Sequence, residues 1–251
     1  KYSKLNPRQK EAVDTVYGPV MVVAGPGTGK TTLLTLRIAN IILKAGAKPE
    51  EILALTFTDS GVKAMRQKLR EVIGDSAFRV NIFTFHSFGN YMRSLYPESF
   101  KKIGTRLPAS ETYTLKIIED ILAEKSFTEL RVSAQFGVTV PKIKGRISDL
   151  KRELVSPEDL VKLISKEVES LKNEDQSQKK MTKTREDEIE RKHKYIKRLR
   201  EFQETYALYE EKMNEKGLYD FDDTILGLID ALKGDKEMLY EMRESFQFIL
   251  A

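Results

Sequence analysis

The spacing of apolar and polar positions in the first hundred residues is typical of an α/β fold. Apolar residues recur every three or four positions in 30–44 and in 62–73, which predicts two helices, each with one apolar face. The first helix should stop at Gly46, because glycine readily caps a helix C-terminus. Buried strands are predicted at the short apolar runs 20–24, 52–57 and 80–85. This alternation predicts a parallel sheet with crossover helices.

The pattern becomes mainly helical from residue 101 to about 215. Ser156–Asp159, which reads Ser-Pro-Glu-Asp, has the form of a helix start, and the almost wholly polar stretch 173–184 predicts a mobile loop. Apolar residues then recur at threes, fours and sevens, which predicts one long helix from roughly Thr184 to Lys216, ended by Gly217.

Short elements return at Tyr219, so the pattern divides the chain into 1–100, 101–215 and 216–251. The apolar residues Phe248–Ala251 predict the opening of another buried strand. A buried strand that stops in its middle predicts that this sequence is part of a longer polypeptide.

Composition excludes several classes of protein. No apolar run is long enough to cross a membrane and the N-terminus lacks the apolar core of a signal peptide, so we expect a cytoplasmic protein without a membrane partner. Cysteine is absent, which excludes disulfides, thiolate metal sites and cysteine nucleophiles. The two histidines, His86 and His193, lie far apart in sequence, which argues against a structural zinc.

The charge distribution favours a polyanionic partner. The net charge is +5. Residues 1–100 carry 14 Lys and Arg against 8 Asp and Glu, whereas 216–251 carry 4 against 8. A basic excess in one part of a chain is the electrostatic mark of a nucleic-acid contact.

A glycine-rich run between a strand and a helix predicts a phosphate-binding loop. Its glycines let backbone N–H groups point at phosphate oxygens, and the following helix presents its positive end to the same anion. Lys30 would neutralise the outer phosphates and the Thr31 hydroxyl would bind Mg²⁺. The expected nucleotide-binding residues are Gln9, Ala24, Gly25, Pro26, Gly27, Thr28, Gly29, Lys30, Thr31 and Thr32. A strict form of the motif has glycine where this chain has Ala24, and the alternative is a glycine-rich turn without a ligand.

Gln9 has two interpretations. Its amide can pair with both edges of an adenine, or it can complete a helix capping box with Asn6. Threonine and phenylalanine cluster where the second and third strands end, and strand ends of a parallel sheet are where open α/β folds bind ligands. Phe83 and Phe85 are expected in the core; Phe57 and Phe88 are equally compatible with base stacking.

Together these segments resemble the superfamily 1 DNA helicases of the UvrD/Rep type, which also have alanine at the first position of the phosphate loop. The matching segments are Gln9, Ala24–Thr31, Leu55–Leu69, Thr84–Phe88, Gly145–Leu160 and Tyr219–Ile225. The resemblance implies a RecA-like P-loop NTPase parallel sheet (1–100 and 216–251) with an inserted, mainly α-helical subdomain (101–215). It implies ATP and Mg²⁺ as cofactors, with Lys30 and Thr31 in catalysis.

The resemblance also implies a track for single-stranded DNA. Phe57 and Phe221 would stack on bases, and Thr58, Thr84 and His86 would lie along the backbone or couple it to the nucleotide. One departure is Asp59-Ser60-Gly61, where the family more often has Asn-Lys-Ala; the lost lysine would weaken a phosphate contact or alter coupling.

The resemblance predicts the N-terminal part of an ATP-dependent 3′–5′ DNA helicase or translocase. Its partners would be single-stranded DNA, single-strand/duplex junctions and a second RecA-like domain of the same polypeptide. The family's Asp-Glu motif would begin just after Ala251, so this part is expected to bind ATP weakly and hardly hydrolyse it. The alternatives are a self-contained P-loop kinase or nucleotide switch, for which no acidic strand end is present, and a non-enzymatic nucleic-acid-binding module. The pathway stays open.

Overall fold

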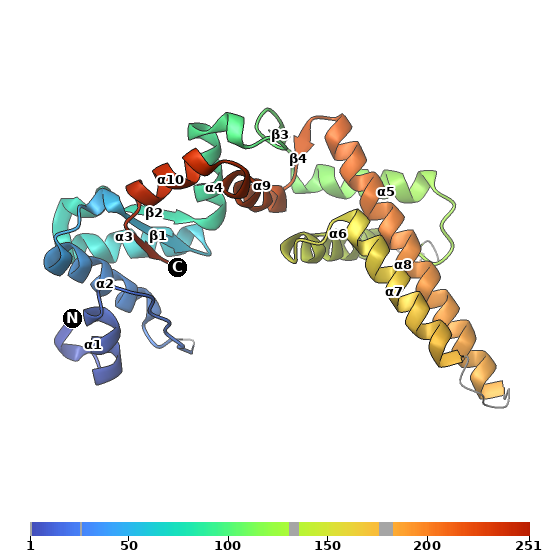
Figure 1. Cartoon of the computed structure of the whole chain (residues 1–251), viewed down its shortest axis with the longest axis horizontal. Helices are drawn as coiled ribbons and strands as arrows, with labels where there is room; N and C mark the ends of the chain where they lie inside the picture. The colour runs from blue at the N-terminus through green and yellow to red at the C-terminus, as the bar shows by residue number, and fades with distance from the viewer. Residues whose placement is uncertain (1, 26, 131–135, 176–182) are drawn as a thin grey trace. The chain divides into compact units, whose positions relative to one another are not determined.

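A computed structural model describes residues 2–25, 27–130, 136–175 and 183–251. The chain forms two compact units (Figure 1). The first unit contains Lys1–Lys101 and Leu228–Ala251, and the second contains Lys102–Gly227. The boundary at residue 227 falls inside helix α9 (Phe221–Gly234).

The first unit is built on a parallel sheet in the order β2-β1-β5. Its strands are β1 (Ile52–Thr56), β2 (Asn81–Thr84) and β5 (Phe248–Leu250). Leu53 of β1 lies opposite Asn81 on one side and Ile249 on the other. The strands predicted at 52–57, 80–85 and 248–251 are therefore confirmed, and so is their parallel arrangement.

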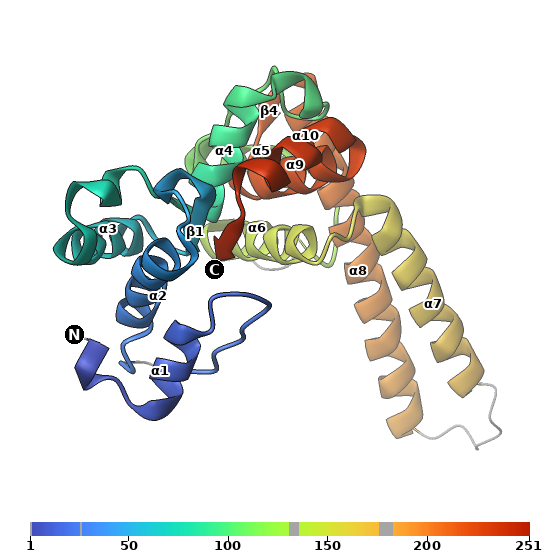
Figure 2. The ribbon, with the colours of Figure 1, turned by 60° about the vertical axis from the view of Figure 1, so that its left-hand side comes forward.

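Helices pack on this sheet through an apolar core. Ile38 of α2, Leu69 of α3 and Ile52 of β1 are almost completely buried in one cluster, and Figure 2 shows α2 and α3 beside β1. Gly46 ends α2 with φ +67°, as predicted. The helical elements of this unit, besides α9, are η1 (Tyr2–Lys4), α1 (Pro7–Asp14), α2 (Lys30–Ala45), η2 (Pro49–Glu51), α3 (Asp59–Ile73), η3 (Gly74–Phe78), α4 (Phe85–Leu95), η4 (Pro97–Ser99) and α10 (Lys236–Ser245).

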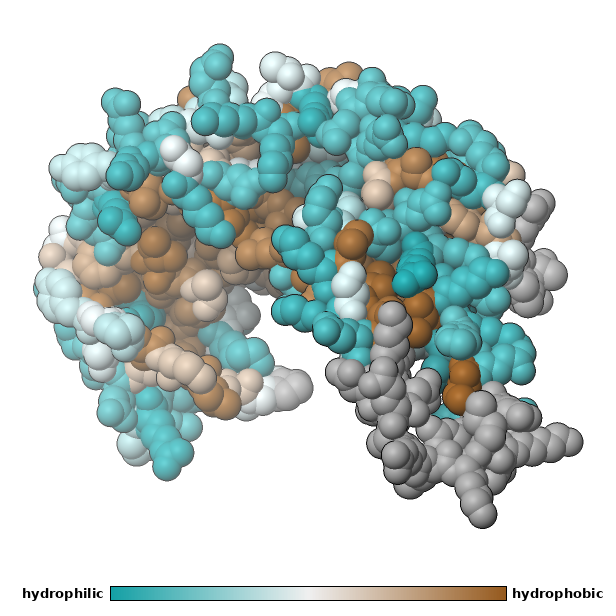
Figure 3. All heavy atoms as spheres, turned by 45° about the vertical axis from the view of Figure 1, so that its right-hand side comes forward, coloured by the Kyte–Doolittle hydropathy of each residue, from teal (hydrophilic) through white to brown (hydrophobic). Residues whose placement is uncertain are grey.

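The strand predicted at 20–24 is wrong. This segment has no regular secondary structure, and Met21 and Val23 are each 87% exposed. A strand is held by ladder hydrogen bonds to a neighbour, and among the described residues no strand pairs with this segment. Its apolar composition cannot replace those bonds. Exposed apolar side chains of this kind contribute to the brown surface that the first unit shows in Figure 3.

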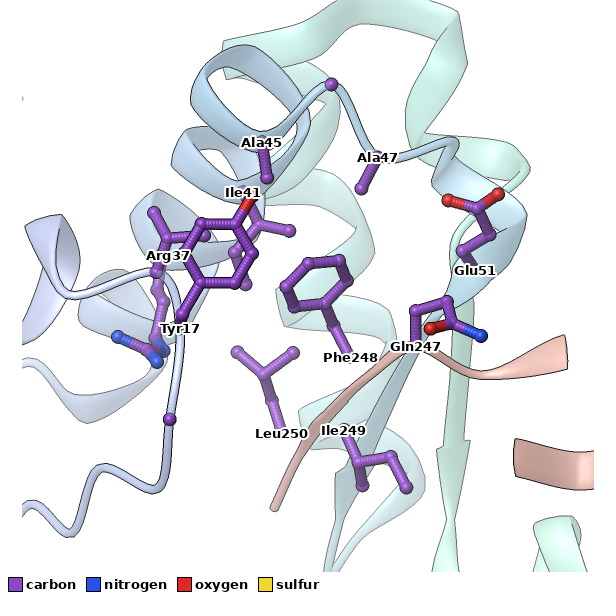
Figure 4. A pocket seen from close by; sticks show the side chains of 13 residues that line it. Tyr17, Arg37, Ile41, Ala45, Ala47, Glu51, Gln247, Phe248, Ile249 and Leu250 are labelled. Carbon is purple, nitrogen blue, oxygen red and sulfur yellow. The ribbon is translucent and has the colours of Figure 1, made fainter. Parts of the chain in front are cut away.

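A cavity of about 490 Å³ lies beside β5, the edge strand of the described sheet. Figure 4 shows Tyr17, Ile41 and Leu250 around it, with Phe248 between them. The Tyr17 and Phe248 rings lie 6.2 Å apart, centre to centre. Arg37, Glu51 and Gln247 line the same cavity, so apolar and polar side chains together border β5 at this edge of the described sheet.

The second unit is mainly helical, with its own core. Ile118, Ile147 and Tyr209 are completely buried together. Figure 1 shows α7 and α8 running side by side. The elements are β3 (Leu107–Pro108), α5 (Glu111–Glu124), α6 (Phe136–Arg152), α7 (Pro157–Asp175), α8 (Lys183–Glu215), β4 (Leu218–Tyr219) and the start of α9, with β3 and β4 parallel.

Two predicted elements of this unit are confirmed. The Ser156 hydroxyl accepts a hydrogen bond of 3.2 Å from the Asp159 amide at the start of α7, and the long helix is α8, followed by Gly217 at φ +62°. The predicted loop 173–184 has its ends in α7 and α8, and its middle, 176–182, lies outside the described residues. Over the described ranges, no helix is long and apolar enough to cross a membrane.

Candidate functional site

The predicted phosphate-binding loop leads directly into α2. Gly27 and Gly29 have φ of +74° and +84°, the left-handed conformation that glycine adopts without strain. The Lys30 ammonium donates to the carbonyl oxygens of Ala24 (3.3 Å) and Gly25 (2.8 Å), so it folds back over the loop. Thr28 also donates to Gly25, at 2.8 Å. Pro26 lies outside the described residues.

These residues fit a phosphate group. A Cβ at Gly27 or Gly29 would meet no atom within 4 Å, so the space beside the loop backbone is open. In the part of the chain that the structure describes, no side chain caps the N-terminus of α2, which leaves its first N–H groups available to an anion. The Lys30 ammonium lies at this end of the helix, where the helix dipole already favours negative charge.

Gln9 adopts the capping geometry and also reaches the loop. Its backbone N–H donates to Asn6 Oδ1 (2.9 Å), and its side-chain Oε1 accepts from the Asn6 N–H (3.0 Å). The side-chain amide Nε2 lies 3.4 Å from the carbonyl oxygen of Thr28. The two interpretations of Gln9 therefore do not exclude each other, because the cap itself brings this amide to the phosphate-binding loop.

Thr32 has a neighbour that the sequence did not indicate. Lys68 of α3 donates a 3.2 Å hydrogen bond to the Thr32 hydroxyl in the first turn of α2. This contact depends on the packing of α2 against α3, which periodicity alone does not specify. It places a second ammonium group beside the helix end that carries Lys30 and Thr31.

Phe57 and Thr58 lie at the C-terminal end of β1. The Phe57 side chain is 87% exposed, so of its two interpretations the buried one is excluded. Thr58 caps α3, since its hydroxyl accepts from the Gly61 N–H at 3.1 Å. A Cβ at Gly61 would lie only 2.6 Å from Thr56 Oγ1. Position 61 is one of those where this chain departs from the family pattern. A residue larger than glycine would fit there only if the Thr56 side chain moved.

Thr84 and His86 lie at the end of β2. Thr84 is buried and caps α4 by accepting from the Ser87 N–H at 3.0 Å, while His86 is half-buried in the first turn of α4. Phe88 is in the core, with 4% of its surface exposed. The core position predicted for Phe85 is wrong: β2 ends at Thr84, so Phe85 starts a helix and is 41% exposed.

Phe221 belongs to the second unit, as the first residue of α9. It is 64% exposed and borders a cavity of about 620 Å³, which is also lined by Lys144, Gly145 and Arg152. Four acidic side chains line the same cavity, Glu111, Asp149, Asp220 and Asp222, and Arg152 and Lys144 are paired with carboxylates among them. The exposed aromatic ring is therefore the feature here that can hold a base. Phe57 and Phe221 are thus placed in different units.

Comparison with known proteins supplies the family. The model of the UvrD/REP helicase N-terminal domain matches residues 5–251. The chain belongs to this family. The parallel sheet of the first unit is consistent with the RecA-like core of UvrD/REP helicases. The predicted α/β class is confirmed.

Curated relatives are similar over nearly the whole chain. The ATP-dependent DNA helicase PcrA of Bacillus subtilis is 28% identical over 250 residues, and that of Staphylococcus epidermidis is 27% identical over 252 residues. PcrA of Staphylococcus aureus is 25% identical over 252 residues. Each alignment covers 98% of this chain and 29% of the relative, so the UvrD/REP chain described here spans less than a third of those proteins.

Proposed function

We propose that this chain is the N-terminal, ATP-binding and single-stranded-DNA-binding part of a cytoplasmic ATP-dependent 3′–5′ DNA helicase. Membership of the UvrD/REP family and the names of the PcrA relatives support this. The observation that carries it is Phe57: a phenylalanine 87% exposed at the C-terminal end of a parallel strand. Burying such a ring against a nucleic-acid base removes apolar surface from water.

The nucleotide site would be formed by the loop 24–29 and the first turn of α2. Lys30 would leave the carbonyl oxygens of Ala24 and Gly25 for the phosphates of ATP, and the Thr31 hydroxyl would bind Mg²⁺. When bound, Mg²⁺ supplies electrostatic stabilisation of the phosphate charge. Gln9 would contact the adenine while its backbone stays in the cap. By itself this part would bind ATP and hardly hydrolyse it.

The proposed DNA-binding residues are Phe57, Thr58, Thr84 and His86 in the first unit and Phe221 in the second. Phe57 and Phe221 would each stack on bases, and the other three would lie along the DNA backbone. Thr58 and Thr84 already cap helices, so their hydroxyls can serve a phosphate only as additional acceptors or donors. In the longer protein, a second RecA-like domain would close over Lys30 and Thr31, and single-strand/duplex junctions would be the substrate.

The domain assignment is part of the proposal. Residues 1–100 and 216–251 would form the RecA-like core and 101–215 the helical insertion, whereas by compactness the second unit runs on to Gly227 and includes Phe221. A kinase or nucleotide switch complete in itself has less support, because the described strands of the first unit, β1, β2 and β5, contain no acidic residue. The exposed Phe57 and Phe221 likewise favour a track for DNA over a purely electrostatic binding module.

The experiment is a titration of a fluorescent single-stranded oligonucleotide followed by anisotropy. Because stacking contributes about 1–3 kcal/mol per base, Phe57→Ala and Phe221→Ala should each weaken binding by about five-fold or more. The matched control is Tyr240→Ala, since Tyr240 is an aromatic residue as exposed as Phe221 (65% against 64%) and lies outside the proposed track. Equal affinity of all three variants and the parent chain would refute the DNA track.

A further inference from the structure

A buried charged cluster holds the segment that carries Phe221. Lys151 of α6 is 2% exposed, although lysine is rarely buried without partners. Its ammonium lies 2.7 Å from Asp223 Oδ1, 3.0 Å from Asp220 Oδ2 and 2.8 Å from Glu210 Oε1. One cation thus joins α6, α8 and the start of α9.

Two of these carboxylates flank Phe221 in the sequence. The Asp220 N–H donates to Asp223 Oδ2 (2.8 Å), and the Asp223 N–H donates to Asp220 Oδ1 (3.1 Å). This reciprocal pair fixes the backbone on both sides of Phe221, in the way a capping box fixes a helix start. The remaining oxygens, Asp220 Oδ2 and Asp223 Oδ1, are the ones that face Lys151.

The rest of the cluster completes the hydrogen bonding of Asp220. The Tyr209 hydroxyl donates to Asp220 Oδ2 at 2.8 Å, and Lys144 lies 3.0 Å from the same oxygen. Both ammonium groups also lie over the Tyr209 ring, 5.6 Å (Lys144) and 5.5 Å (Lys151) from its centroid. The carboxylate that starts α9 is therefore oriented from several directions.

The titration of the cluster agrees with this arrangement. Burial alone lowers the pKa of Lys151, but the carboxylates of Asp220, Asp223 and Glu210 outweigh it and raise that pKa above its ordinary value. Burial raises the pKa of Asp220, yet Lys151 and Lys144 hold it well below the usual range. Lys151 and Asp220 are therefore both charged at neutral pH.

We propose that Lys151 is a positioning residue for single-stranded DNA, which holds Phe221 at the border of the cavity that it shares with Lys144 and Asp222. The proposal rests on the proposed stacking of a base on Phe221. Removing the Lys151 charge would leave Lys144 on Asp220 but take the cation away from Asp223 and Glu210, and the uncompensated buried carboxylates would loosen the turn. The Phe221 ring would then have to be ordered by the DNA itself, at a cost in affinity.

The first measurement uses the full 251-residue chain and needs no DNA. The chain contains no tryptophan, so Phe221→Trp introduces a single indole whose nanosecond anisotropy decay reports local motion. Adding Lys151→Met should increase the amplitude of the fast component. The matched control is Lys142→Met, which removes an exposed lysine charge from the same helix and should leave the decay unchanged. An unchanged decay in the Lys151 variant would overturn the proposal.

The second measurement is a double-mutant cycle on oligonucleotide affinity. Lys151→Met should weaken binding by about the same factor as Phe221→Ala, about five-fold or more, and the double variant should lose no more than either alone. If the double variant lost affinity by the product of the two single factors, Lys151 would act independently of Phe221 and would be a merely structural residue. If Phe221→Ala leaves affinity unchanged, the stacking role fails, and the indole decay alone then decides whether Lys151 orders the turn.

A further variant guards against unfolding. Should Lys151→Met fail to fold, as judged by circular dichroism, Asp223→Ala removes one carboxylate and the bond to the Asp220 N–H while leaving Lys151 two partners. It should increase the fast motion of the same indole. A folded Asp223→Ala chain with an unaltered decay would overturn the proposal as well.

Discussion

At the scale of single residues, the polar side chains at the strand ends have structural roles of their own. Thr84 is 7% exposed, and its hydroxyl accepts the Ser87 N–H at 3.0 Å while Ser87 Oγ accepts the Thr84 N–H at 2.8 Å. Thr58 caps α3 in a comparable way. A change of DNA affinity on substituting either threonine therefore has to be separated from the loss of a helix cap.

The cap of α4 makes a prediction for Thr84. Thr84→Ala should lower the free energy of unfolding by about 1–2 kcal/mol, the usual cost of losing a threonine cap. Thr84→Ser keeps the hydroxyl and should retain most of the stability. Urea denaturation followed by circular dichroism measures both. Loss of DNA affinity in Thr84→Ala without any loss of stability would contradict the capping role.

At the scale of elements, local signals predicted the helices better than the strands. Helix α2 ends at a left-handed Gly46, α7 starts at the Ser156 cap and α8 follows a long apolar periodicity, all features encoded within one turn or one repeat. The run 20–24 has the composition of a buried strand, but a strand needs a partner from elsewhere in the chain. Periodicity does not identify that partner.

The same distinction applies to the candidate site. The glycine-rich loop follows from a motif at fixed spacing. The residue pattern left Phe57 equally compatible with the core and with base stacking, and only the resemblance to the family implied stacking. The contact from Lys68 to Thr32, and the cluster of Lys151 with Asp220, join residues 36 and 69 positions apart. Such contacts arise from helix packing and carry no local sequence signal.

The loop before residue 130 illustrates how one carboxylate can fix an element. Glu201 of α8 accepts hydrogen bonds from the backbone N–H groups of Thr128 (2.9 Å), Glu129 (2.8 Å) and Leu130 (2.9 Å). Burial raises the pKa of Glu201, but these bonds outweigh it and hold the pKa below the ordinary value. The ionised carboxylate therefore ties this loop to α8.

The lowered pKa fixes the pH dependence of this contact. The contribution of this contact to the free energy of unfolding should be complete above about pH 4.3, the pKa of glutamate in the unfolded chain. It should decline as the pH falls through the lower pKa that Glu201 has in the folded chain. Glu201→Gln should cost about 1.5–3 kcal/mol at pH 7 and remove this part of the acid sensitivity. Urea denaturation at pH 7 and at pH 4 measures both effects. Glu169→Gln, an exposed site on α7, is the control; equal changes in both variants would contradict the role of Glu201.

At the scale of the whole molecule, the described residues form two large hydrophobic clusters that share no residue, one in each unit. One cluster joins α2, α3 and the sheet around Ile38 and Leu69, and the other joins α5, α6 and α8 around Ile118, Ile147 and Tyr209. We therefore expect each unit to unfold cooperatively in its own right. The exposed Phe57 depends on the first core and Phe221 on the second.

Separate cores predict separate unfolding. Leu69→Ala and Ile147→Ala, both at completely buried positions, should each cost about 2–5 kcal/mol. Because each substitution opens a cavity in one core only, it should speed native-state amide exchange in peptides of its own unit and leave the other unit unchanged. Hydrogen–deuterium exchange with mass spectrometry resolves the two sets of peptides, and each variant is the control for the other. If either substitution accelerated exchange equally in both units, the chain would unfold as one cooperative body. The binding effects of Phe57→Ala and Phe221→Ala could then not be assigned to two independently folded units.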